Sequence, residues 1–107
     1  MNFVCIHGVK NGVSLGFKIP KSDDLLIMQG ILHYFIGTID YETEEPSAYA
    51  VANYKKSLEF LEAFKFNPKA TACFIRTSND IAVVWTEREE PKKAQGFLKD
   101  AEKVQKF

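Results

Sequence analysis

The sequence lacks the features that mark the most easily recognised classes of protein. Its 14 basic and 14 acidic residues cancel, so there is no excess of charge of either sign. Balanced charge removes the overall cationic bias that drives contact with nucleic acid. Only two cysteines occur in the 107 residues, each within an apolar run, which is typical of reduced buried thiols and not of a disulfide framework.

Signals for export and for membrane insertion are also missing from the sequence. The first ten residues do not combine a basic start with a long apolar run and a cleavage site. The longest strongly apolar run, residues 25–36, is interrupted by Gln29, Gly30 and His33. It is shorter than the roughly 20 residues that a membrane span requires. We therefore expect a cytoplasmic protein without a membrane segment.

Motifs for catalysis, nucleotides and metals are absent or weak. No phosphate-binding glycine loop occurs. Cys5 and His7 would point the same way on a strand, but a nucleophile also needs an orienting group and an oxyanion donor, which the sequence does not indicate. A zinc site formed by Cys5, His7, His33 and Cys73 lacks the close ligand pairs of structural zinc sites. We expect no catalytic residue, cofactor or metal, and keep a small enzyme with a site near Cys5 and His7 as an alternative.

What the chain does contain is enough apolar sequence for one folded domain. Of its residues, 46% are apolar and 13% are aromatic, which is ample for a single core at this length. We therefore predict one domain over residues 1–107.

Two segments have the composition of β-hairpins. Residues 3–19 hold two β-like runs around Asn11-Gly12, a pair suited to a type I′ turn. Residues 70–77 and 81–88 are rich in β-branched and aromatic side chains around Ser78-Asn79-Asp80. The register of the second hairpin stays open, because either Phe74 or Cys73 would face Trp85. The core face predicted for the first hairpin consists of Val4, Ile6, Leu15, Phe17 and Ile19.

Three segments have helical periodicity. The first begins at Ser22 and is predicted to end at Gly37 in a left-handed cap, before an acidic connection over residues 38–47. The second covers about residues 46–65, and the third begins around Pro91. The first helix is nearly apolar on all sides and needs cover on two of them. Its predicted core stripe is Leu25, Met28, Ile31, Leu32 and Phe35.

The predicted order of elements is β-β-α-α-β-β-α. This order indicates an α+β fold in which two hairpins form a four-stranded antiparallel sheet and the helices pack mainly on one face.

A small domain with no evident catalytic group and with excess apolar helix surface is typical of a protein that binds another protein. We predict a non-enzymatic regulator, inhibitor or adaptor with a protein partner, and a homodimer is possible. Nucleic-acid binding through the lysine-rich last helix, with Arg76 and Arg88, is a second alternative. The candidate partner-binding residues lie on the far side of the first helix, in the acidic connection and at the margin of the second helix: Leu26, Gly30, His33, Asp40, Glu42, Glu44, Glu45, Tyr49 and Phe60.

Overall fold

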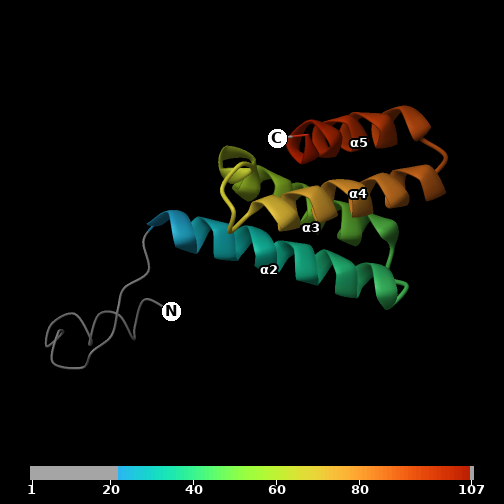
Figure 1. Ribbon diagram of the computed structural model, residues 1–107. Helices are drawn as coiled ribbons and strands as arrows, with labels where there is room; N and C mark the ends of the chain where they lie inside the picture. Colours follow the sequence, from blue (N-terminus) through green and yellow to red (C-terminus); the bar gives the residue numbers. More distant parts are fainter. Residues whose placement is uncertain (1–21, 107) are drawn as a thin grey trace, which may run out of the picture.

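The computed structural model describes residues 22–106, and all of its regular elements in that range are helices (Figure 1). They are α2 (Ser22–Glu42), α3 (Ser47–Leu61), the short 3-10 helix η2 (Glu62–Phe64), α4 (Thr71–Glu87) and α5 (Pro91–Gln105). The predicted α+β fold with a four-stranded antiparallel sheet is therefore wrong. The first predicted hairpin, with its turn and its apolar face, lies outside the described residues.

The helices form an array in which each one packs against the next along the chain. α2 contacts α3, α3 contacts α4, and α4 contacts α5. Figure 1 shows consecutive helices running in opposite directions, with α2 at one side of the array and α5 at the other. Short connections favour such antiparallel neighbours. As a result, α2 and α5 are the two end helices of the described array.

Helix α4 replaces the predicted second hairpin. Its buried residues include Phe74, Ser78, Ile81 and Trp85, which are spaced four, three and four residues apart and therefore share one face of a helix. Packing of this face outweighs the β propensity of the individual residues, which depends strongly on context. The residues predicted as a turn, Ser78-Asn79-Asp80, lie in the middle of the helix.

Helix α2 continues past Gly37, which was predicted to end it. Gly37 and Gly30 are both buried in the helix interior. A Cβ atom at Gly30 would lie 2.6 Å from side-chain atoms of Leu61, and one at Gly37 would lie 2.8 Å from the ring of Tyr54. The two glycines are therefore sites of close approach to α3, and the connection between the helices shortens to residues 43–46.

The core face of α2 is also opposite to the one predicted. Ile27 and Tyr34 are buried together with the two glycines. Of the five residues predicted to face the core, Ile31 is partly buried, whereas the other four are exposed: Leu25, Met28, Leu32 and Phe35. The sequence pattern allowed either face to point inward, and the close fit of α3 against the glycines selects one.

The other two predicted helices are present. Helix α3 and η2 together occupy most of residues 46–65, and Val51, Tyr54 and Leu61 are buried as the pattern requires. Helix α5 begins at Pro91, whose missing backbone N–H is tolerated in the first helical turn. Ala94, Ala101 and Val104 are buried on its inner face, while Leu98 is 46% exposed.

Candidate protein-binding surface

The most distinctive surface of the described protein is the side of α2 that faces away from α3. We call it the outer stripe. Its residues are separated by three or four positions in alternation, so they lie along one face of the helix. They are between 38 and 58% exposed, and they are Leu25, Met28, Leu32, Phe35 and Ile39.

The outer stripe contains no charged group over most of its length. Between Asp24 and Asp40, α2 contains no Asp, Glu, Lys or Arg. A helix on the surface of a protein normally turns charged and polar residues to solvent. Single exposed apolar side chains are ordinary, but a contiguous row of them marks an interaction surface.

Acidic residues stand at both ends of the outer stripe. Residues 22–46 contain six acidic residues and no lysine or arginine. Two are in the first turn of α2, two are near its C-terminus, and two are in the following connection, namely Asp23, Asp24, Asp40, Glu42, Glu44 and Glu45. The surface is thus apolar in its centre and negatively charged at its ends.

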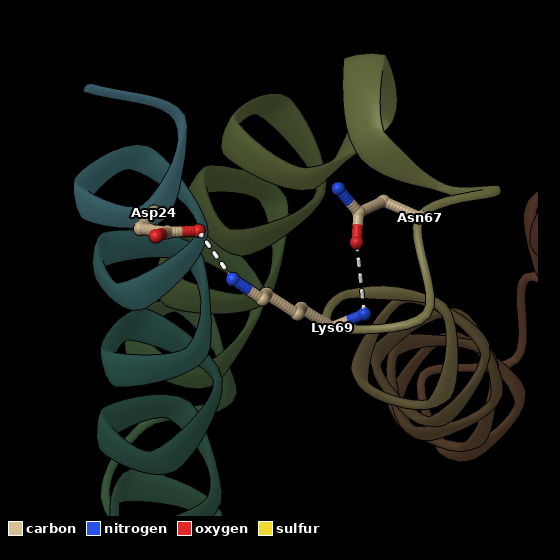
Figure 2. A network of polar contacts seen from close by, with 3 residues as sticks. All are labelled: Asp24, Asn67 and Lys69. Carbon is tan, nitrogen blue, oxygen red and sulfur yellow. Dashed lines mark hydrogen bonds and ion pairs between the residues drawn. The ribbon is translucent and has the colours of Figure 1, made fainter. Parts of the chain in front are cut away.

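The N-terminal end of α2 is attached to the connection between α3 and α4. The Lys69 ammonium forms an ion pair with Asp24, with Nζ 3.1 Å from Oδ1 (Figure 2). The backbone N–H of Lys69 donates to Oδ1 of Asn67 at 2.9 Å. Figure 2 shows that Lys69 reaches from this connection across to α2. The pair places one positive charge beside the acidic first turn.

Four of the sequence-predicted partner-binding residues lie where α2 packs on α3. The rings of His33 and Phe60 stack with centroids 5.6 Å apart. His33 Nδ1 lies 3.1 Å from Oδ1 of Asn53, whose amide nitrogen donates to Asp40 Oδ2 at 2.9 Å. Gly30 is buried beside them. The structure therefore brings these residues together in an intramolecular helix contact.

The remaining predicted residues are exposed but dispersed. Leu26 is 38% exposed and follows the first residue of the outer stripe, while Tyr49 is 56% exposed in the first turn of α3. Glu42, Glu44 and Glu45 are exposed at the C-terminal end of α2 and in the connection. Sequence reasoning missed the outer stripe because it assigned four of its five residues to the core and placed Ile39 in the acidic connection. Gly30 and Gly37, seven residues apart, are the signal that identifies the inner face.

The C-terminal half of α2 is joined to α4 by tyrosines. The hydroxyl of Tyr34 donates to Asp80 Oδ2 at 2.7 Å, and that of Tyr41 donates to Glu87 Oε2 at 2.9 Å. Burial, and then the hydrogen bond to the Asp80 carboxylate, raise the pKa of Tyr34 to about 12. These bonds hold α2 in place from its inner side, and no other helix within residues 22–106 covers the outer stripe.

Other chemistry has little support among residues 22–106. Burial raises the pKa of the Cys73 thiol, which works against a reactive thiolate. No group of three His, Cys, Asp or Glu side chains in this range is placed to hold a metal ion. Cys5 and His7 lie outside the described residues, so the alternative of a site near them stays a prediction. None of the described helices is long and apolar enough to cross a membrane.

Comparisons with known proteins point in one direction. No family model matches the chain, and no solved structure matches it. The chain is 30% identical over 97 residues to KIF-binding protein of Gallus gallus, covering 91% of this chain and 16% of that protein. It is 27% identical over 96 residues to the Xenopus tropicalis protein of the same name, covering 89% of this chain and 15% of that protein.

KIF-binding protein of Danio rerio is 35% identical over 78 residues, which cover 67% of this chain and 11% of that protein. The chain thus spans about a sixth or less of the length of these curated relatives. The relatives are named for binding another protein, and the likeness concerns a short part of each of them.

Proposed function

We propose that this chain is a non-enzymatic protein-binding adaptor and that a partner docks on the outer stripe of α2. The observation that carries the proposal is the row of five exposed apolar side chains without a charge among them. Covering such a row with a partner removes apolar surface from water, which is the main driving force of association. The similarity to KIF-binding proteins supports the same class of function.

The chemistry of the partner follows from the pattern of the stripe. Apolar residues three and four positions apart are complementary to a helix with the same spacing. The acidic ends favour a partner helix with lysine or arginine beside its apolar row. A KIF protein is the proposed source of this helix, because the relatives are named for binding KIF.

A second copy of the chain is a less suitable occupant of the stripe. Acidic residues stand at both ends of α2, so two copies of this helix would bring like charges together whether they ran parallel or antiparallel. We therefore favour a heterologous partner over the homodimer that the sequence suggested.

Nucleic-acid binding through α5 has no specific support. Lys93 of α5 pairs with Glu90 at 3.3 Å, and Lys106, which directly follows α5, pairs with Glu102 at 2.8 Å. We also propose the cytoplasm as the compartment, on the basis of the two cysteines in apolar runs.

Binding of a purified KIF protein to the full chain, measured by isothermal titration calorimetry, tests the proposal. We expect the double variant Leu32→Asp, Phe35→Asp to lose at least about tenfold in affinity, because two carboxylates would be buried in an apolar contact. The matched control is Leu98→Asp, which changes a leucine of similar exposure on α5. Equal affinity of the double variant and the original protein would contradict the proposal, as would an equal loss in the control.

Sedimentation equilibrium of the full chain distinguishes a homodimer from a monomer that binds a different protein. A chain that stays monomeric at high micromolar concentration agrees with a heterologous partner. A dimer that the Leu32→Asp, Phe35→Asp variant abolishes would assign the stripe to a second copy instead.

A further inference from the structure

A concave surface separate from the outer stripe lies over α4, between α3 and α5. It is a groove of about 370 Å³, within the range of about 300–1,000 Å³ typical of ligand pockets. Its apolar lining includes Leu58 of α3, Phe74 of α4 and Phe97 of α5. Phe74 is buried, and the other two are partly buried. The groove therefore offers aromatic and aliphatic surface from three helices.

An unpartnered hydroxyl group lines this groove. Ser78 is 1% exposed, and its Oγ has no hydrogen-bond partner among the described residues. Two other hydroxyl residues of α4 donate to the carbonyl four residues earlier, Thr77 to Cys73 at 2.7 Å and Thr86 to Ala82 at 2.8 Å. Buried polar groups are nearly always hydrogen-bonded. The buried Ser78 hydroxyl therefore has unused hydrogen-bonding capacity at the lining of the groove.

The edge of the groove has a negative charge. Glu59, Glu62 and Asp100 line it, together with a single cation, Lys55. Glu62 already pairs with Lys65 at 2.7 Å, whereas no ion pair involves Glu59 or Asp100 within residues 22–106. The Lys55 ammonium lies 5.6 Å from the centre of the Trp85 ring. Two carboxylates at the edge are thus left for positive groups of a ligand.

We propose that this groove binds a tyrosine side chain in a protein segment where lysine or arginine flanks the tyrosine. A phenol ring matches the lining of Leu58, Phe74 and Phe97, and its hydroxyl supplies the hydrogen bond that Ser78 lacks. Flanking cations would meet Glu59 and Asp100 at the edge. An arginine in the groove fits less well, because its charge would be placed on the apolar lining.

The experiment is an NMR titration of the 15N-labelled full chain with three short capped peptides, Lys-Tyr-Lys, Lys-Phe-Lys and Glu-Tyr-Glu. We expect Lys-Tyr-Lys to shift the amide signals of Ser78 and Phe97. It should bind about fivefold more tightly than Lys-Phe-Lys, which lacks only the hydroxyl. Glu-Tyr-Glu should bind more weakly than either, because its charges match those of the groove edge.

Three single variants connect the peptide preferences to named groups. Ser78→Ala should bind the tyrosine and phenylalanine peptides equally, since the hydrogen-bonding hydroxyl is gone. Asp100→Asn should weaken both lysine-containing peptides to a similar extent. The matched control is Glu89→Gln, an exposed residue in the α4–α5 connection that does not line the groove, and it should behave as the original protein. An amide spectrum that keeps its native dispersion shows that each variant is folded.

The inference would be wrong if the unmodified protein bound the tyrosine and phenylalanine peptides with equal affinity. It would also be wrong if Glu-Tyr-Glu bound tightly, or if the peptides did not shift the amide signals of Ser78 and Phe97. A tyrosine preference that persists in Ser78→Ala would contradict it as well. The groove does not include the outer stripe, so the Leu32→Asp, Phe35→Asp variant should bind the peptides normally. Failure of the proposed KIF interaction and failure of this inference are therefore distinguishable.

Discussion

The two end helices of the array, α2 and α5, differ in what they turn toward solvent. Each packs mainly against one neighbouring helix, so each has a free outer face. In α5 the exposed residues include Lys92, Lys99 and Lys103, whereas the outer face of α2 is the apolar outer stripe. The two helices have equivalent positions in the fold, so the difference lies in their residues: exposed lysines are typical of a helix face in contact with water, whereas the apolar outer stripe is the face for which a partner is proposed.

The glycines of these two helices also differ in their surroundings: Gly37 is packed against another helix, and Gly96 is exposed. Gly37 of α2 lies against the ring of Tyr54, and its replacement would force atoms apart. Gly96 of α5 is exposed, and an added Cβ would meet no atom within 4 Å. A glycine in a helix therefore marks close packing in one case and weakens a solvated turn in the other.

The largest expected effect comes from filling the space at Gly37. We expect Gly37→Leu to lower the free energy of unfolding by about 3 kcal/mol, because the new side chain overlaps Tyr54 in a packed interface. The control Gly96→Leu should raise it by about 0.5 to 1 kcal/mol, through better helix propensity. Chemical denaturation of both variants measures the difference, and a shift of the same sign in both would break the comparison.

High pH should weaken the attachment of α2 to α4. The pKa of Tyr34 rises from 10.0 to about 12 in the folded protein, so the folded state holds the phenolic proton more tightly than the unfolded chain does. The resulting stabilisation is complete below about pH 10 and is lost as the pH rises through about 12, a change of about 2 to 3 kcal/mol. Urea denaturation between pH 9 and pH 12 measures it.

The variant Tyr34→Phe is the control for the loss of stability at high pH. It should be less stable at neutral pH, because the hydrogen bond to Asp80 is removed. Its stability should also depend less on pH between 10 and 12. The remaining dependence comes from Tyr54, whose pKa is raised by burial, and from Tyr41, whose pKa is raised by its hydrogen bond to Glu87. An unchanged alkaline loss in this variant would show that Tyr34 is not responsible.

A smaller effect on stability is expected at Ser78, whose hydroxyl has no hydrogen-bond partner within residues 22–106. Ser78→Ala should raise the free energy of unfolding by about 1 kcal/mol, because a buried unsatisfied group is removed. The adjacent Thr77→Ala should lower it, since Thr77 is buried and hydrogen-bonded. Thermal unfolding of the pair checks the contrast, and a loss of stability in Ser78→Ala would mean that its hydroxyl has a partner within the folded chain.

The smallest effect on stability is expected at the outer stripe itself. Leu32→Gln and Leu98→Gln should each change the free energy of unfolding by less than about 0.5 kcal/mol, because both leucines face solvent. A much greater loss of unfolding free energy for Leu32→Gln than for Leu98→Gln would mean that the isolated chain already covers the outer stripe. Parallel thermal melts of the two variants decide between these outcomes.

Of the four α-helices, the sequence predicted α3 and α5, predicted α2 only in part, and wrongly predicted a hairpin in place of α4. In α5, a narrow apolar stripe lies beside many lysines, so the sequence shows both the helical period and the side of the helix that faces the core. In α4, the β-branched and aromatic composition favoured strands, although the spacing of Phe74, Ser78, Ile81 and Trp85 is helical. Composition and spacing thus favour different structures in this segment, and packing of the helical face decides between them. Helix α2 was predicted to exist, but with the wrong end and the wrong inner face.

The candidate surfaces were less predictable than the helices. The sequence indicated that the first helix needs cover on two sides, and this conclusion agrees with a buried face and an exposed apolar stripe on α2. It did not indicate which side α3 covers. His33 and Phe60 were predicted to meet a partner, and they stack on each other within the chain. The groove at Ser78 is formed by residues of three helices, so no local pattern could reveal it.

The sequence by itself determined that most of the described chain contains amphipathic or apolar helices, and that apolar surface exceeds what one helix contact can bury. These are properties of residue type and spacing within a single segment. Only the tertiary structure decided that residues 71–87 are helical, that Gly30 and Gly37 face α3, and that Leu32 faces solvent. The physical reason is that each of these outcomes depends on the fit between segments distant in sequence, and local propensities of a few tenths of a kcal/mol per residue are outweighed by close packing across the whole interface.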